Sequence, residues 1–182
     1  MFSRLLQAFG LGRFEDVVTL RDHEFMKDRI LAVIDDYTPP TIHPAISKTD
    51  WDDIDNINDW FNICFTDQDK ERIAKYFLGR FQRSCDIGNY WFNQYQPQSG
   101  SSHKFHIHGN TDFVMIYFVE LQDKRVRTVL KHPKTGKIFA PKVKEGDLLI
   151  FPGSIEHSSP PNLTDTRKTI VSFNVNFNDD AC

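Results

Sequence analysis

The sequence predicts an α+β fold in which N-terminal helices brace one side of an antiparallel β-barrel. Up to about residue 86 the apolar residues recur at helical spacing, and from Gly88 onward they alternate with a period close to two. Short strands that follow a helical segment are typical of α+β proteins. Since no linker or internal repeat interrupts the 182 residues, we expect one domain over 1–182, with a helical part over 1–86 and a sheet core over 87–180.

Three helices are expected in the N-terminal part. Two of them have a capping pattern, Thr19-x-x-Asp22 and Thr66-x-x-Asp69, in front of an apolar face. The apolar faces that identify the helices lie over 25–37, 54–65 and 73–81.

Seven strands are expected after Gly88, and turn residues such as Pro133-Lys134-Thr135-Gly136 separate many of them. Their length and spacing are typical of jelly-roll barrels. The expected strand ranges are 89–95, 104–108, 112–121, 125–131, 137–143, 147–152 and 168–177.

Composition gives no signal for nucleic-acid binding, secretion or membrane insertion. The formal net charge is −3 and Lys and Arg form no block, so there is no strong signal for nucleic-acid binding. Three scattered cysteines favour a reducing, cytoplasmic setting. Residues 1–12 lack the apolar core of a signal peptide, and no later run suits a membrane span. Nothing in the pattern indicates the oligomeric state.

The strongest chemical signal is Phe105-His106-Ile107-His108. Alternation along a strand puts His106 and His108 on one face and the apolar pair on the other. Two imidazoles on a rigid strand make half of a metal site, although an isolated H-x-H also occurs on exposed edge strands.

A second segment completes the pattern. Residues 146–152 form an apolar strand that ends in Pro152-Gly153, and His157 follows a few residues later. In a jelly-roll barrel, such a segment brings a distal ligand back to the first pair. The two halves, about fifty residues apart, predict a metal site made of His106, His108 and His157.

The other four histidines have no ligand-like spacing. His103 lies close to the H-x-H pair but is expected to be exposed at the surface. His23, His43 and His132 have no partners in the sequence and are expected to be solvated.

Arg167 follows His157 by ten residues and opens a strand with clear alternation. Arg167 and Thr169 share parity with the apolar residues at 171–177, which would aim the guanidinium into the barrel. A buried guanidinium needs an anion, and a carboxylate suits its planar fork. The alternative is an exposed arginine just before the strand.

Together these features resemble the Fe(II)/2-oxoglutarate-dependent oxygenases, over residues 88–177. The pattern is similar to that of small oxygenases of phages and marine bacteria, which share H-x-H, F-P-x4-H and a terminal R-x-[ST] strand. The resemblance implies a double-stranded β-helix that binds Fe(II), uses 2-oxoglutarate as cosubstrate together with O2, and hydroxylates a small-molecule or peptidyl substrate.

The resemblance also implies a cosubstrate site. Arg167 would bind the C5 carboxylate of 2-oxoglutarate, with Thr169 beside it. Asn93-Gln94-Tyr95 is similar to the N-x-Y motif of the dealkylating branch, whose Asn and Tyr contact the cosubstrate. Tyr117 has the inward parity of its own strand, because Glu120 marks the outward one.

The sequence departs from the family at the third metal ligand. His106 and His157 take the two histidine positions, but His108 stands where the family has a carboxylate. The third ligand could be His108, could be Asp112 from the next strand, or could be missing. We expect three histidines, since His108 has the correct parity and imidazole suits iron.

Two other functions compete with this interpretation. Gly100-x5-His106-x-His108-x3-Asp112 and Gly146-x5-Pro152-x4-His157 resemble the cupin motifs. They would support a cupin-type metal dioxygenase that needs no 2-oxoglutarate. Its four metal ligands would be His106, His108, Asp112 and His157. The other alternative is a non-catalytic barrel that binds a small molecule. Arg167 favours the oxygenase, since it has no obvious role in the cupin scheme.

Overall fold

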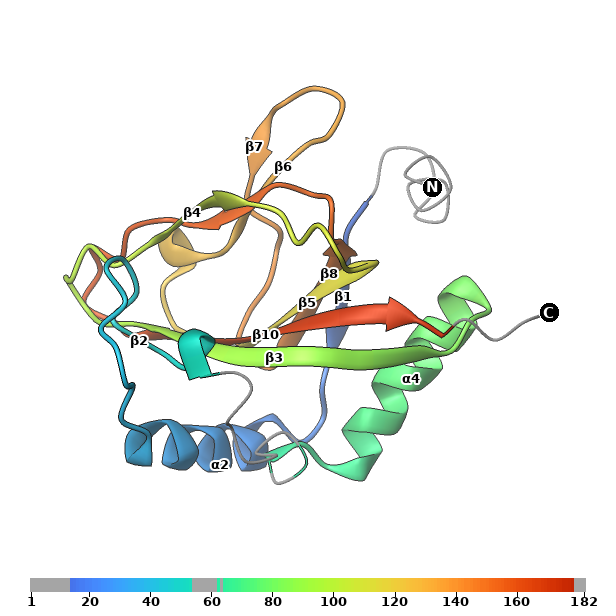
Figure 1. Ribbon diagram of the computed structural model, residues 1–182, viewed down its shortest axis with the longest axis horizontal. Helices are drawn as coiled ribbons and strands as arrows, with labels where there is room; N and C mark the ends of the chain where they lie inside the picture. The colour runs from blue at the N-terminus through green and yellow to red at the C-terminus, as the bar shows by residue number, and fades with distance from the viewer. Residues whose placement is uncertain (1–13, 54–61, 63, 179–182) are drawn as a thin grey trace.

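The computed structural model describes residues 14–53, 62 and 64–178. In this part of the chain, two α-helices and two antiparallel sheets form an α+β fold (Figure 1). The helices are α2 (His23–Asp36) and α4 (Asp67–Phe81). Two short 3-10 turns are η1 (Trp51–Asp53) and η2 (Lys124–Val126).

Strands from distant parts of the sequence alternate between the two sheets. The six-stranded sheet consists, in spatial order, of β1 (Asp16–Thr19), β8 (Asp147–Pro152), β5 (Phe113–Leu121), β10 (Lys168–Phe177), β3 (Cys85–Tyr95) and β2 (Lys48–Thr49). The four-stranded sheet consists of β4 (His103–His106), β9 (His157–Ser159), β6 (Val129–Lys131) and β7 (Ile138–Phe139).

The six-stranded sheet is covered on both faces. Figure 1 shows α2 and α4 against one face and the four-stranded sheet on the other side. On β10, Val171 and Phe173 belong to the apolar cluster that includes residues of both helices. Ile170 belongs to a second cluster, which includes Leu130 of the four-stranded sheet. The space between the sheets is therefore a separate core from the one under the helices.

Most predicted strands are present. β8 and β10 have the bounds expected from alternation, and β5 begins one residue late. β9 was not predicted, because three residues are too few to show a period. The N-terminal part is not purely helical, since β1 and β2 form the two edges of the six-stranded sheet, where they pair with β8 and β3.

The two capping patterns behave differently. Thr66 caps α4, its hydroxyl accepting the Asp69 amide at 3.2 Å as expected. Thr19 instead ends β1 and donates to Asp147 Oδ1 at 2.7 Å, so its prediction as a helix cap was wrong. The helix expected over 54–65 falls mainly outside the described residues. Within the described part, no helix has the length and apolar character needed to cross a bilayer.

Candidate metal centre

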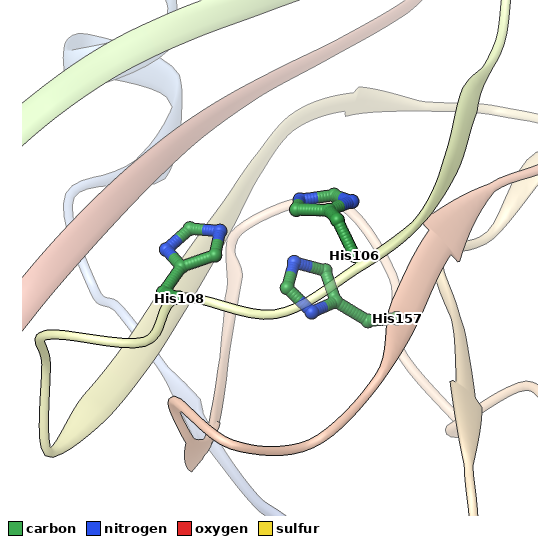
Figure 2. A group of neighbouring side chains, drawn as sticks. All are labelled: His106, His108 and His157. Atoms are coloured by element: carbon green, nitrogen blue, oxygen red, sulfur yellow. The ribbon is translucent and has the colours of Figure 1, made fainter.

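Three histidines from two adjacent strands converge on one point. His106 ends β4, His108 lies two residues further on, and His157 begins β9 directly opposite His106 in the strand register. One ligand nitrogen from each ring lies within 4.8 Å of the others. Figure 2 shows the three rings gathered around a common space. Among the described residues, these three are the only such group of His, Cys, Asp or Glu side chains that could hold a metal ion.

Hydrogen bonds set which nitrogen of each ring carries the proton. His106 Nδ1 lies 2.8 Å from the Lys104 carbonyl, and His157 Nδ1 lies 3.1 Å from the Ile155 carbonyl. A carbonyl oxygen only accepts, so both Nδ1 atoms carry a proton and donate. Each ring is left with an Nε2 lone pair, which is the form that binds a metal.

His108 reaches the same tautomer in another way. Its Nδ1 lies 2.6 Å from Oδ1 of Asn174, a side chain of β10. Trp91 of β3 stacks on the His108 ring, with centroids 5.5 Å apart. The third ring is therefore oriented by side chains of the larger sheet.

Burial keeps the three imidazoles neutral. Desolvation lowers the pKa of His106 and of His108, and it lowers the pKa of His157 well below its ordinary value. Neutral imidazole is the metal-binding form, so the ligands are available at pH 7 without first losing a proton.

We therefore expect metal affinity to persist below pH 6.5, the ordinary pKa of histidine. Protons compete with the metal only when pH falls to the lowered pKa values, so the loss should begin in more acidic solution than the usual range near pH 6–7. Co(II) titrations between pH 5 and pH 8, against a chelator of known protonation, measure this. A steep loss of affinity between pH 7.5 and pH 6.5 would contradict it.

A close backbone contact holds the ligand segment. The His108 amide donates to the Gly153 carbonyl at 2.8 Å, and the Gly153 amide donates to the Asp112 carbonyl at 3.0 Å. A Cβ on Gly153 would lie 2.4 Å from the Thr111 carbonyl oxygen and 2.8 Å from that of His108. Only glycine allows these segments to approach so closely.

Asp112 does not join the histidines. Its Oδ2 accepts the Phe177 amide at 3.0 Å, at the end of β10. The carboxylate thus satisfies a backbone donor in the larger sheet, and the structure assembles three histidines without it.

The triad faces two connected cavities. The outer cavity has a volume of about 370 Å³ and the inner one is narrow. The inner cavity passes His157 and ends at Tyr95, Thr128 and Ser159. Among the described residues that line the outer cavity there is no Asp, Glu, Lys or Arg. Both cavities share Trp91, Asn93, His103 and His106.

A buried cation lies next to the inner cavity, bonded to two residues of its wall. The Lys168 side chain is fully buried, and its Nζ donates to Ser159 Oγ at 2.5 Å and to Thr128 Oγ1 at 3.5 Å. Its ammonium also lies 5.1 Å from the centre of the Tyr95 ring. Desolvation lowers the pKa of Lys168 to about 7. Within the described residues no carboxylate pairs with it, so the pocket suits an anion.

Tyr95 adds a second polar group to this end. Its hydroxyl is buried and has no hydrogen-bond partner of normal geometry in the described structure, although Ser159 is nearby. Burial raises the pKa of Tyr95, so the hydroxyl remains a donor. A buried ammonium and an unpaired buried hydroxyl together fit the oxygens of a carboxylate.

Solved structures of similar fold share this arrangement of elements. The viral collagen prolyl hydroxylase vCPH from Paramecium bursaria Chlorella virus-1, solved with 2OG, matches with a TM-score of 0.63 and 11% identity over 90% of this chain and 96% of that one. The chain has the fold of the 2OG-Fe(II) oxygenases. AviO1 from Streptomyces viridochromogenes gives a TM-score of 0.67 at 12% identity, over 98% and 96% of the two chains. A prolyl-4-hydroxylase from Pseudomonas putida gives 0.61 at 10% identity, over 97% and 98%.

Comparison of sequences finds no relative of this chain, whereas comparison of structures finds proteins of the same fold. No protein-family model matches the chain, and no curated protein matches it. Identities of 10–12% to these oxygenases therefore establish the shared fold and nothing finer.

In this oxygenase fold, Arg167 does not point into the inner cavity, contrary to expectation. Its guanidinium forms a forked ion pair with Glu120, at 2.8 Å from Nε and 2.9 Å from Nη2. Thr169 donates to the same carboxylate and accepts from Gln94 Nε2 at 3.3 Å. Tyr117 also lies on the helix side, where its hydroxyl is 2.7 Å from Nδ1 of His23.

The reason is a reversed assignment of the two faces of β10. Its apolar residues pack under the helices, whereas Lys168, Ile170 and Ser172 face the space between the sheets. Because Arg167 shares parity with the apolar residues of β10, its side chain lies on the face of the strand opposite to the cavity. Asn93 and Tyr95, by contrast, line the cavity walls.

Two histidines expected at the surface line the cavity instead. The His103 ring stacks on the His106 ring, with centroids 4.0 Å apart, and burial together with His106 lowers the pKa of His103 to about 4. The register of β4 against β9 shifts between these two residues, which brings both to one face. His43 lies in the outer wall, where its Nδ1 accepts the amides of Ala45 and Ile46. A strand irregularity and a distant loop leave no periodic signal in the sequence.

Proposed function

We propose that the chain is an Fe(II)- and 2-oxoglutarate-dependent dioxygenase that hydroxylates its substrate. One observation carries the proposal: two of the three converging histidines, His106 and His157, line the inner cavity, and a buried ammonium without a carboxylate partner in the described structure, that of Lys168, donates to Ser159 in the wall of the same cavity. A metal that binds one end of a keto acid and a cation that binds the other are what 2-oxoglutarate requires.

We also infer that the two sheets form a double-stranded β-helix. From β3 to β10 the chain passes back and forth between the sheets, with four strands in each, and every pairing among them is antiparallel. That alternation is the topology of a jelly roll, and the fold of the oxygenases supports it.

The residues of the chain have distinct tasks. His106, His108 and His157 would hold the iron through Nε2, and Lys168 with Tyr95 would bind the C5 carboxylate of 2-oxoglutarate. When bound, the iron would allow O2 to act as the oxidant and 2-oxoglutarate would supply two electrons, so that one oxygen atom enters succinate with loss of CO2 and the other enters the hydroxyl group of the substrate.

A site of three neutral histidines supplies no negative charge to balance that of Fe(II), so this charge must come from the cosubstrate. Three imidazoles add no charge, so the only negative charge among the groups that would bind Fe(II) is the C1 carboxylate of 2-oxoglutarate, because the C5 carboxylate is assigned to Lys168. We infer that the anionic cosubstrate contributes more to metal retention here than at a site with a carboxylate ligand.

The outer cavity indicates what kind of group reacts. Its wall combines the edge-to-face pair Trp51 and Trp91, whose centroids are 4.4 Å apart, with carboxamide side chains. A charged group would find no counter-ion in this wall. We propose that the substrate, a small molecule or a peptidyl group, presents an uncharged carbon centre to the metal.

The cupin-type alternative explains less of the structure. It needs Asp112 as a ligand, and that carboxylate accepts the Phe177 amide. It also leaves the burial of the Lys168 ammonium without a purpose. A non-catalytic barrel leaves both the tautomers of the three histidines and the buried cation unexplained.

Anaerobic titration of the Fe(II)-loaded protein with 2-oxoglutarate tests the proposal. A metal-to-ligand charge-transfer band should appear, and admission of O2 should produce succinate slowly even without the true substrate. Pyruvate is the matched control, because it has the keto-acid end and lacks the distal carboxylate. If the loaded protein shows neither the band nor succinate, dependence on 2-oxoglutarate is wrong.

A further inference from the structure

The three candidate ligands are not supported in the same way. Two of the histidines donate Nδ1–H to a backbone carbonyl two residues upstream, so the local chain fixes their tautomers. His108 lies beyond the end of β4 and donates to a side chain, Asn174 of β10. The protonation of its Nδ1 is therefore set by a single replaceable carboxamide from the other sheet.

The backbone is irregular at this carboxamide. On the β3 side the register passes from Phe173 opposite Tyr90 to Val175 opposite Ile87, so two residues of β3 face Asn174. On the β5 side Asn174 pairs regularly with Val114. The extra residue belongs to β3, directly opposite Asn174, and bulges of this kind are frequent beside functional sites.

The carboxamide also lies where it can act on the site. Asn174 lines the outer cavity together with His108 and Trp91. Trp91 stacks on the imidazole, while Asn174 hydrogen-bonds its Nδ1 at 2.6 Å. Stacking sets the plane of a ring, but only a hydrogen bond decides which nitrogen is protonated.

We propose that Asn174 is a positioning residue of the metal centre, which holds His108 in the Nδ1–H tautomer with Nε2 toward the ion. This role rests on the proposed metal site. Partners of this kind orient the ligand, and their loss typically lowers metal affinity by about tenfold to hundredfold.

Zn(II) titration compares four proteins: wild type, Asn174→Leu, Asn174→Asp and Asn176→Ala. The leucine variant keeps the volume and removes the acceptor, so its Zn(II) affinity should fall by about tenfold to hundredfold. The aspartate variant keeps an acceptor for Nδ1–H and should retain affinity. Asn176 is the matched control, because its Oδ1 accepts the Asp112 amide at 3.0 Å and bonds no histidine in the described structure.

Nitrogen NMR of the Zn(II)-loaded proteins separates positioning from general damage. The wild type should show three imidazoles with a protonated Nδ1 and a metal-bound Nε2. In Asn174→Leu, the His108 Nδ1 proton alone should exchange rapidly with solvent, while those of the other two ligands stay protected. A merely structural role would disturb all three rings or none.

Failure of the proposed metal site and failure of the proposed role of Asn174 would give different results. If the wild type binds no Zn(II), the metal site is wrong and the role of Asn174 falls with it. If the wild type binds Zn(II), and Asn174→Leu binds it equally well with an unchanged His108 signal, the metal site stands and the role of Asn174 is wrong.

Discussion

Replacing Lys168 by methionine should raise the 2-oxoglutarate concentration needed for half-maximal turnover by about thirtyfold to thousandfold, while iron binding is unchanged. Loss of a desolvated, charge-assisted contact costs about 2–4 kcal/mol, and 1.4 kcal/mol corresponds to tenfold. Lys168 is the buried cation that donates to Ser159 in the wall of the inner cavity. Steady-state succinate formation against 2-oxoglutarate concentration measures the effect.

The adjacent residue provides the control. Arg167→Met removes a cation one position away, but that guanidinium is paired with Glu120 on the other face of the strand, so the 2-oxoglutarate requirement should change little. Methionine at 168 replaces a buried charge by an apolar chain of similar length, so the variant should not lose thermal stability. A large effect of Arg167→Met with a small effect of Lys168→Met would restore Arg167 as the cosubstrate anchor.

The pH dependence of 2-oxoglutarate binding provides a second test of the role of Lys168. The pKa of Lys168 in the free protein is lowered to about 7, and a bound carboxylate favours the charged ammonium. As pH rises above about 7 the charged fraction falls, so 2-oxoglutarate affinity should weaken by up to about tenfold per pH unit. In Lys168→Met this dependence should disappear.

Replacing any of the three histidines by alanine should lower iron affinity by about a hundredfold or more. Metal sites of this size bind with about 10–16 kcal/mol in total, so each of a few ligands contributes roughly 3–4 kcal/mol. His106 and His157 share one strand pair, and His108 completes the group within 4.8 Å. Competition with a chelator, followed by metal analysis, measures the loss.

Asp112 is the informative comparison for His108. Its carboxylate accepts the Phe177 amide at 3.0 Å, and the asparagine of Asp112→Asn can still accept that bond through Oδ1. Asp112→Asn should therefore keep both the fold and the iron affinity of the wild type, whereas His108→Ala should not. Wild-type affinity in His108→Ala, together with a loss in Asp112→Asn, would restore a site of two histidines and one carboxylate.

Local periodicity was sufficient for the longer strands of the large sheet, whereas β9, which bears His157, was not predicted, and His108 lies beyond the end of β4. The period-two pattern at 147–152 and 168–177 predicts β8 and β10 within their observed bounds, because alternation is a property of the strand itself. The α4 cap at Thr66 is equally local. The H-x-H spacing is also local, and strand pairing then places His157 opposite His106.

Which face of a strand looks into the site was decided only by the tertiary structure. Both faces of β10 are covered, one by helices and one by the second sheet, so apolar residues mark the helix contact and not the cavity. Because the two faces of β10 were assigned in reverse, Arg167 was expected on the cavity side, whereas Lys168 is the cation found there. The sequence by itself determined that three histidines and a cation follow one another at oxygenase-like spacing. Packing against distant elements decided which cation is buried and which acceptor, Asn174, orients the third imidazole, because such contacts join residues that no local period connects.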